Sequence, residues 1–219
     1  MLKIGHRGAK GHVNENTLVS FAKALELNVD AIELDVHLSK DGEVVVIHDE
    51  TIDRTTNKTG FVSEFTAFKL KQLGIPTLRE VIQLVDKKCI LNIEIKEAAA
   101  TEKVIEIIEQ FINERNWTFS QFQVSSFIWE TLEAISNINS QIMLGVLTED
   151  SIENALAFAK KIKAFSINPY YKLLNQESCE IIKSSGFNIY TWTVNTPEDL
   201  IFVKSLPVDG IISDFPDRI

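Results

Sequence analysis

Residues 90–127 read ILNIEIKEAAATEKVIEIIEQFINERNWTFSQFQVSSF, and this stretch sets the architecture that we expect. Ile90–Lys96 and Gln123–Phe127 are short, mostly apolar runs, typical of strands that are buried on both faces. Between them, apolar residues recur at helical spacing within Thr101–Asn116. The stretch therefore predicts a strand, a helix and a second strand.

The same alternation extends along the whole chain. Helix starts are indicated by the capping box Thr77-Leu78-Arg79-Glu80 and by Thr196-Pro197-Glu198-Asp199, where a hydroxyl precedes proline and acids. The other predicted strands are Leu2–His6, Ala31–Val36, Ile142–Thr148, Ala164–Asn168, Asn188–Val194 and Gly210–Ser213.

Eight strands with intervening helices indicate a parallel barrel or a doubly wound sheet. No Gly-x-Gly-x-x-Gly follows the first strand, which disfavours a dinucleotide-binding sheet. We therefore predict an α/β fold, a (β/α)8 TIM barrel. Only Asp214–Ile219 follow the last strand, too few residues for a full eighth outer helix.

Composition sets further limits. The 219 residues suit one domain, 1–219, and their net charge of −9 disfavours binding to nucleic acid. No apolar run is long enough for a secretory signal or an integral membrane segment, so we expect a soluble cytoplasmic protein. Cys89 and Cys179 lie beside apolar residues and are predicted to be buried free thiols.

One segment interrupts the alternation after the second strand. Asp41-Gly42 separates two β-rich runs and predicts a hairpin excursion. A two-residue turn would place Asp35 opposite His48 and would gather Glu33, Asp35 and His48 on one face. His37 is expected to project along the hairpin, away from this group.

Pairs of charged residues on the predicted strands are candidates for chemistry. Glu33 and Asp35 are two residues apart, so their carboxylates point the same way and suit a hard cation. Surface acids paired with lysines are the alternative, but the apolar flanks indicate an interior strand. Glu94 and Lys96 repeat the spacing, and a structural ion pair is the alternative there.

Basic and proton-exchanging residues follow two strands. His6-Arg7 ends the first strand and joins an imidazole, which titrates near neutral pH, to a guanidinium suited to phosphate oxygens. His48-Asp49 ends the hairpin. Either pair alone carries little information.

Together, His6-Arg7, Glu33-x-Asp35 and His48-Asp49 resemble the signature of the glycerophosphodiester phosphodiesterase family, a phospholipase C-like phosphodiesterase barrel. Further blocks resemble the family in order along nearly the whole chain: Glu15-Asn16-Thr17, Lys40-Asp41-Gly42, Asp53–Asn57 with Gly60, Glu94-x-Lys96, Ser125–Phe127, Thr191–Asn195 and Asp209–Asp214.

The resemblance implies metal-dependent hydrolysis of a small-molecule glycerophosphodiester to glycerol 3-phosphate and an alcohol, at the mouth of the barrel. It implies the following roles: Glu33, Asp35 and Glu94 as ligands of one divalent cation (Mg²⁺ or Ca²⁺), His6 and His48 as general acid and base, Arg7 and Lys96 as phosphate contacts, Trp192 as the wall of the substrate pocket, and Glu15 as a residue that orients Arg7 or joins the metal environment. The oligomeric state stays open.

Two departures from the family pattern bear on substrate choice. Asn14 stands where a proline is expected, and only about fifteen residues separate Gly60 from Pro76, where many relatives carry a longer insertion. A shortened insertion predicts an open mouth that admits bulkier diesters, including lysophospholipids. The rival readings are another phosphodiesterase on a similar barrel, a catalytically silent barrel that binds a phosphorylated ligand, and an unrelated metal-dependent aldolase or isomerase barrel.

Overall fold

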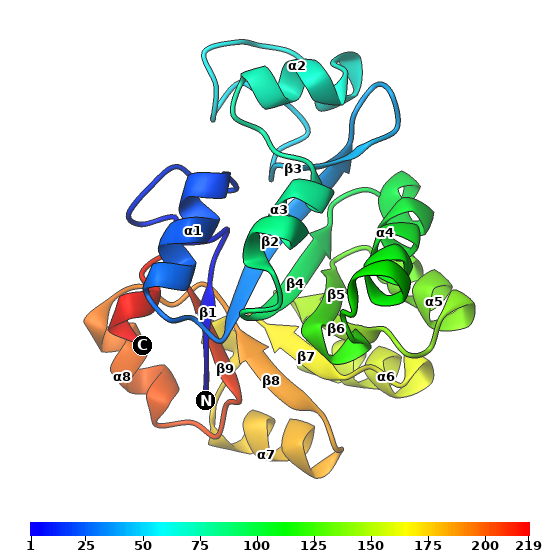
Figure 1. Cartoon of the computed structure of the whole chain (residues 1–219). Coiled ribbons are helices and arrows are strands. Elements are labelled where there is room, and N and C mark those ends of the chain that lie inside the picture. Colours follow the sequence, from blue (N-terminus) through cyan, green and yellow to red (C-terminus); the bar gives the residue numbers. More distant parts are fainter.

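The computed structural model describes residues 1–219 and contains a closed barrel of parallel strands (Figure 1). β1 pairs with β2 on one side and with β9 on the other, which closes the ring. The predicted (β/α)8 barrel is confirmed. Its strands are β1 (Leu2–Gly5), β2 (Ala31–Leu38), β4 (Ile90–Ile95), β5 (Phe122–Ser126), β6 (Met143–Thr148), β7 (Ser166–Pro169), β8 (Asn188–Thr191) and β9 (Gly210–Ser213).

Helices connect successive barrel strands and cover the outside of the ring (Figure 1). The predicted caps are present: the Thr77 hydroxyl accepts the Glu80 N–H, and Thr196 caps the helix that has Pro197 in its first turn. The short 3-10 helix η5 (Pro216–Arg218) follows β9. The outer helices are α1 (Leu18–Glu26), α3 (Leu78–Val85), α4 (Thr101–Arg115), α5 (Trp129–Ile138), α6 (Ile152–Ile162), α7 (Gln176–Ser184) and α8 (Pro197–Lys204). Three more 3-10 helices, η2 (Ala98–Ala100), η3 (Phe119–Gln121) and η4 (Tyr171–Leu173), lie in the loops.

Residues 39–76, which we call the excursion, project above the barrel at the top of Figure 1. β2 continues past the ring and pairs antiparallel with β3 (Val44–Val46), which is followed by η1 (Val62–Glu64) and α2 (Ala67–Gln72). The excursion has a small apolar core of its own, formed by Val45, Ile47, Ile52, Val62, Ala67, Leu70 and Ile75. It is therefore a packed element that can hold side chains over the barrel mouth.

The predicted register of the hairpin is wrong by one residue. Leu38 pairs with Val44, and Asp35 lies opposite Ile47, whose N–H it accepts, instead of His48. The loop has three residues because Ser39 pairs with Glu43 and Gly42 adopts a left-handed conformation (φ +77°).

The apolar pattern could not reveal this shift because both faces of β3 are buried. Val44 and Val46 belong to the main core, whereas Val45 packs in the core of the excursion. Alternation identifies a register only where one face meets water. The loop is fixed instead by polar contacts, since Asp41 accepts hydrogen bonds from the Ser39 hydroxyl and the Ala67 N–H.

Cys89 and Cys179 are both buried and unbridged, as predicted. No helix has the combination of length and apolarity that crossing a bilayer requires.

Candidate active site

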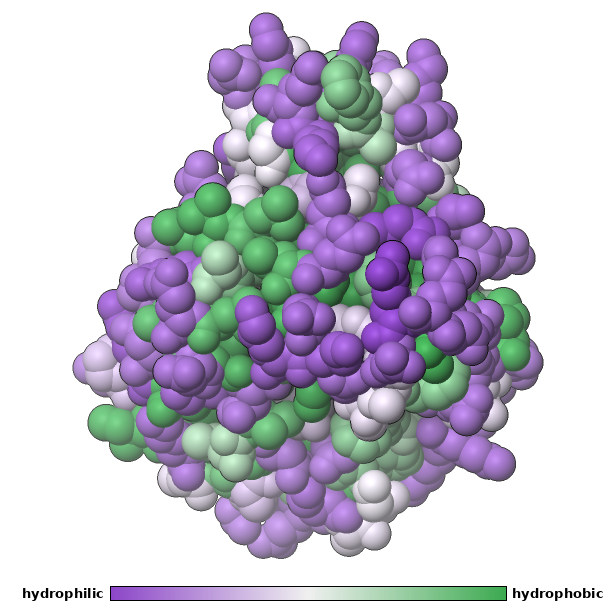
Figure 2. Space-filling model, viewed as in Figure 1, coloured by the Kyte–Doolittle hydropathy of each residue, from purple (hydrophilic) through white to green (hydrophobic).

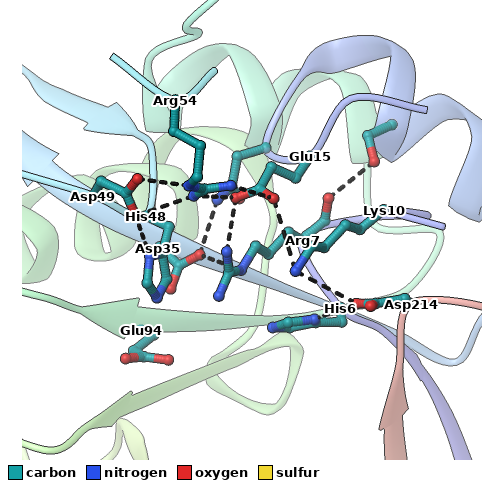
Figure 3. Close-up of polar contacts among 12 residues, drawn as sticks. His6, Arg7, Lys10, Glu15, Asp35, His48, Asp49, Arg54, Glu94 and Asp214 are labelled. Atoms are coloured by element: carbon teal, nitrogen blue, oxygen red, sulfur yellow. Dashed lines mark hydrogen bonds and ion pairs between the residues drawn. The ribbon is translucent and has the colours of Figure 1, made fainter. Parts of the chain in front are cut away.

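The carboxyl ends of the barrel strands and the end of the hairpin converge on one cavity. His6 follows β1, Glu94 and Lys96 end β4, Trp192 follows β8, and His48 reaches in from the excursion. Arg7 and Glu33 also line the cavity. The structure thus brings the predicted residues together: Asp35 lies beside the lining acids, and Glu15 lies between Arg7 and Arg54 (Figure 3).

Three acids form the floor of this site. Glu33, Asp35 and Glu94 each offer a carboxylate oxygen, and these oxygens lie within 4.8 Å of one another. Burial and the nearby Asp35 carboxylate raise the pKa of Glu94 to about 7, and the same two causes raise the pKa of Glu33. Asp35 is 1% exposed, and its Oδ1 atom has no hydrogen-bond partner. The three clustered carboxylates therefore repel one another unless a cation or a proton compensates, and Asp35 Oδ1 can still accept a ligand.

Neighbouring groups hold these acids in place. The Arg7 N–H donates to Glu33 Oε2 at 2.9 Å, and Asn16 Nδ2 donates to Asp35 Oδ2 at 2.8 Å. Arg7 can turn its N–H inward because it adopts a left-handed conformation (φ 50°), which is uncommon outside glycine. Asn16 lay within a block that resembled the family, but nothing in the sequence indicated its contact with Asp35.

Two cations face the acids. Arg7 Nε lies 3.2 Å from Asp35 Oδ2 without hydrogen-bond alignment, and Lys96 Nζ donates to Glu94 Oε1 at 2.6 Å. Burial lowers the pKa values of both basic groups, but the acids outweigh it and leave both pKa values raised. Both side chains are charged, and both lie where a bound anion would meet them.

Each of the two histidines is held by an aspartate. His6 Nδ1 lies 2.5 Å from Asp214 Oδ1, and His48 Nδ1 lies 2.6 Å from Asp49 Oδ1. A carboxylate accepts the proton on Nδ1, so Nε2 is the free nitrogen of each neutral ring. His48 Nε2 lies 3.3 Å from Lys96 Nζ. Burial is the main cause that lowers the pKa values of His6 and His48, which favours neutral rings near pH 7.

Arg54 joins two parts of the site; its segment resembled the family, but no role was predicted for it. Its Nε and Nη2 atoms donate to Asp49 at 2.7 and 3.0 Å, and its Nη1 and Nη2 atoms donate to Glu15 at 2.9 and 2.8 Å (Figure 3). Glu15 in turn accepts from Arg7 Nη1 at 2.7 Å. Burial would raise the pKa of Glu15, but hydrogen bonds from Arg54 and Arg7 lower it to about 2.

Other supporting residues were also missed or misjudged. His37 does not line the cavity, but it is buried, and its Nε2 donates to the His48 carbonyl at 3.1 Å. Asn195 accepts the Asp214 N–H at 2.9 Å and donates to Asp214 Oδ2 at the same distance. Asp214 and Asn195 lie in two separate segments that resemble the family. Nothing in the sequence indicated that Asn195 would hold Asp214, or that Asp214 would hold His6.

Aromatic side chains form one wall of the cavity. Trp192 donates its indole N–H to the Asn168 carbonyl at 2.8 Å, which fixes the ring. Phe127 packs edge-on against Trp192 with ring centroids 5.5 Å apart. Both residues line the cavity, so an apolar surface faces the charged groups.

Residues 6–218 match the model of the glycerophosphoryl diester phosphodiesterase family. A glycerophosphodiester phosphodiesterase of Caldanaerobacter subterraneus subsp. tengcongensis is 37% identical, with 100% of this chain and 96% of the relative covered.

Solved structures agree with this match. The glycerophosphodiester phosphodiesterase of Thermotoga maritima is 33% identical, with a TM-score of 0.86 over 99% of this chain and 96% of its own. A phosphodiesterase of Oleispira antarctica, solved with the product sn-glycerol-3-phosphate, is 25% identical, with a TM-score of 0.90 over 99% of this chain and 94% of its own. The chain belongs to the glycerophosphoryl diester phosphodiesterase family.

Proposed function

We propose that this protein hydrolyses glycerophosphodiesters to glycerol 3-phosphate and an alcohol, by general acid–base catalysis with a divalent cation. One observation carries the proposal: two aspartate-held imidazoles, three clustered carboxylates and two cations line or border a single cavity. The Oleispira relative, solved with sn-glycerol-3-phosphate as its product, supports the choice of substrate.

Glu33, Asp35 and Glu94 would hold the cation, Mg²⁺ or Ca²⁺. Hard cations prefer carboxylate oxygens, and the unpartnered Oδ1 of Asp35 is a free acceptor in a buried place. When bound, the cation would polarise the phosphoryl group and offset the negative charge of the diester.

Arg7 and Lys96 would bind the phosphate oxygens. Arg7 lines the cavity while its Nε stays 3.2 Å from Asp35, so its guanidinium presents a fixed positive charge to an incoming anion. Their fixed positive charges stabilise the charge that develops on phosphate in the transition state. Glu15 is a positioning residue, because its hydrogen bond to Arg7 Nη1 keeps the guanidinium aimed at the cavity.

His6 and His48 would transfer the protons. The aspartate on each Nδ1 leaves Nε2 free to accept a proton from the nucleophile or to donate one to the leaving alkoxide. The nucleophile is water, or the glycerol 2-hydroxyl through a cyclic phosphate. The barrel supplies His6 and the excursion supplies His48, so we also propose that residues 1–219 act as one domain.

A second candidate substrate class, lysophospholipids, is favoured by an apolar groove near the site. Apolar surface gathers over α1, below the excursion (Figure 2), and a groove there is lined by Val13, Leu18, Val19, Ile75 and Pro76 together with polar residues that include Lys71 and Glu80. An acyl chain could lie in such a groove. A human relative that is 21% identical is named lysophospholipase D GDPD1.

A substrate panel with metal control tests both candidates. Glycerophosphocholine and glycerophosphoethanolamine should be cleaved, EDTA should stop the reaction, and Mg²⁺ or Ca²⁺ should restore it. Turnover of lysophosphatidylcholine in place of the small diesters would identify the second candidate. No release of glycerol 3-phosphate with any added metal would refute the proposal.

Histidine variants test the roles of the two rings. His6→Ala and His48→Ala should each lower kcat by about 10²–10⁴-fold in folded protein. His12 is the matched control, because it bonds Asp217 and does not line the cavity. Glu33→Ala should lower the rate and weaken metal dependence together. The cytoplasmic location expected from the sequence stays a prediction.

A further inference from the structure

The middle of the barrel interior is polar, unlike the branched apolar packing that is usual in this fold. Gly145 stands among the side chains of Gln123, Ser166 and Asn168, where an added Cβ would lie within 3.1 Å of each of them. An apolar cluster of Ile4, Ala31, Tyr190 and Ile212 lies elsewhere in the interior. A buried polar interior costs stability unless its groups are bonded, so it calls for a function.

Part of this polar interior is satisfied internally. Gln123 Nε2 donates to Ser166 Oγ at 2.7 Å, and Ser166 Oγ donates to Asn168 Oδ1 at 2.7 Å. None of these three residues lines the catalytic cavity. Their contacts are those of a structural network.

Asn92 and Ser125 differ from that network in their position, because Asn168 Nδ2 also lacks a hydrogen-bond partner but lies outside the catalytic cavity. Asn92 Oδ1 and Ser125 Oγ are buried and have no hydrogen-bond partner, although the two residues are only 3% and 1% exposed. Both residues line the cavity that holds His6 and His48. The third cavity-lining residue with such an atom is Arg7, which we assign to the phosphate. Asn92 and Ser125 therefore present unused polar groups to whatever fills the cavity.

Their place in the sheet puts these groups beside the acids. Asn92 is the Cα partner of Glu33 across β2 and β4, and Ser125 is the partner of Glu94 across β4 and β5. Neighbouring strands lie about 4.8 Å apart. A short alcohol attached to a phosphate at Arg7 and Lys96 can therefore reach both side chains.

The chemistry of the pair identifies the group that it binds. An amide and a hydroxyl are neutral and can both donate and accept, as alcohol hydroxyls do. They add no positive charge for a phosphate, and a quaternary ammonium has no hydrogen to donate to them. The wall formed by Trp192 and Phe127 suits the carbon side of the same alcohol.

We propose that Asn92 and Ser125 bind the free hydroxyl groups of the glycerol part of the substrate and so select polyol diesters over simple alkyl diesters. This inference rests on the proposed function and makes it more specific. A site with buried groups meant for a hydroxyl rejects the analogue that lacks it, because those groups are then left unpaired.

The test compares two diesters that differ by one hydroxyl and both keep the 2-hydroxyl, a candidate nucleophile: glycerophosphocholine and 2-hydroxypropyl phosphocholine. The wild-type kcat/KM should favour the glycerol diester by about 100-fold or more, because two buried groups are left unpaired with the other diester. Ser125→Ala removes one oxygen atom and should lower that ratio about tenfold, and Asn92→Leu should lower it at least as much. Ser166→Ala is the matched control, because it removes a hydroxyl that is already bonded within the barrel and lies outside the cavity. This control should change thermal stability and leave the ratio as it is.

Different results would contradict the role of Asn92 and Ser125 and the proposed hydrolysis itself. A wild-type ratio near one overturns the assignment of Asn92 and Ser125 without any variant. An equal loss on both diesters in a folded Ser125→Ala or Asn92→Leu protein overturns it too, because a structural effect would act on both. A wild-type protein that cleaves neither diester, with metal added, contradicts the proposed function itself.

Discussion

Arg54→Ala should slow turnover strongly although Arg54 does not line the catalytic cavity. The guanidinium donates two hydrogen bonds to Asp49 and two to Glu15. Asp49 orients His48, and Glu15 orients Arg7. The Arg54 side chain therefore helps to position both His48, which transfers a proton, and Arg7, which contacts the phosphate. Arg54 and Glu15 are 39 residues apart in the sequence.

The expected size of the effect follows from these contacts. The Arg54 side chain is 46% exposed, so solvent screens its ion pairs and their share of the folding free energy is small, about 1 kcal/mol. Catalysis is more sensitive, because the loss of a residue that orients a catalytic group commonly costs 10–100-fold. We expect kcat to fall by about 10–100-fold and KM to rise by a smaller factor, since Arg7 keeps its contact with Asp35.

Steady-state kinetics on glycerophosphocholine measure this effect, with melting temperature as the check on folding. Added guanidinium should partly restore kcat in Arg54→Ala, because the vacated position is open to solvent and its two carboxylates remain. Arg54→Lys keeps the charge but not the planar fork, so its kcat should lie between wild type and Arg54→Ala. Arg79→Ala is the matched control, since Arg79 bonds Gln110 on the outer face of the barrel.

Two results would refute this reasoning. Wild-type kcat and KM in Arg54→Ala would mean that neither His48 nor Arg7 depends on the network. A loss of activity that follows the loss of folded protein, with no response to guanidinium, would mean that Arg54 only fastens the excursion to the barrel.

Three further predictions concern the same site. Asp214→Asn should lower kcat at least tenfold with little change in KM, because His6 loses its orienting carboxylate; steady-state kinetics would contradict this if kcat were unchanged. The pKa of Glu15 is lowered to about 2, so its stabilising contribution of about 3 kcal/mol is complete above pH 4.5 and lost as pH falls through about 2. In urea titrations, the difference in unfolding free energy between wild type and Glu15→Gln should shrink over that range, and a constant difference would rule this out. Mg²⁺ or Ca²⁺ added to EDTA-treated protein at 100 times its Kd should raise Tm by about 5–10 °C, whereas Glu33→Ala should show little shift; equal shifts in both proteins would count against the carboxylate site.

The barrel and the acid cluster were accessible from the sequence because both depend on local spacing. Apolar runs of strand length alternated with helical periodicity, and the parallel strands followed in that order. Glu33 and Asp35 share a face because they are two residues apart on one strand. Glu94 joins them because β4 pairs with β2, with Asp35 opposite Glu94.

The hairpin register and the supporting residues were not accessible in this way. The register depends on the conformation of Gly42 and on the contact between Asp41 and Ala67, neither of which leaves an apolar pattern. Arg54 lies in a segment that resembles the family, but nothing in the sequence indicates that its partners are Asp49 and Glu15. Its role appears only once the excursion has folded over the barrel mouth.

Closure of the barrel explains why the place of His6 beside the acids was predicted but its partner Asp214 was not. β1 lies between β2 and β9, so His6 has Glu33 on one side, at 3.9 Å, and Asp214 on the other. The first neighbour is 27 residues away in the chain, whereas Asp214 is 208 residues away. The tautomer of His6 is therefore fixed only when the first and last strands meet. Loosening the pairing of β1 with β9 should then impair proton transfer at His6 before it disturbs the carboxylate cluster, which rests on the adjacent strands β2 and β4.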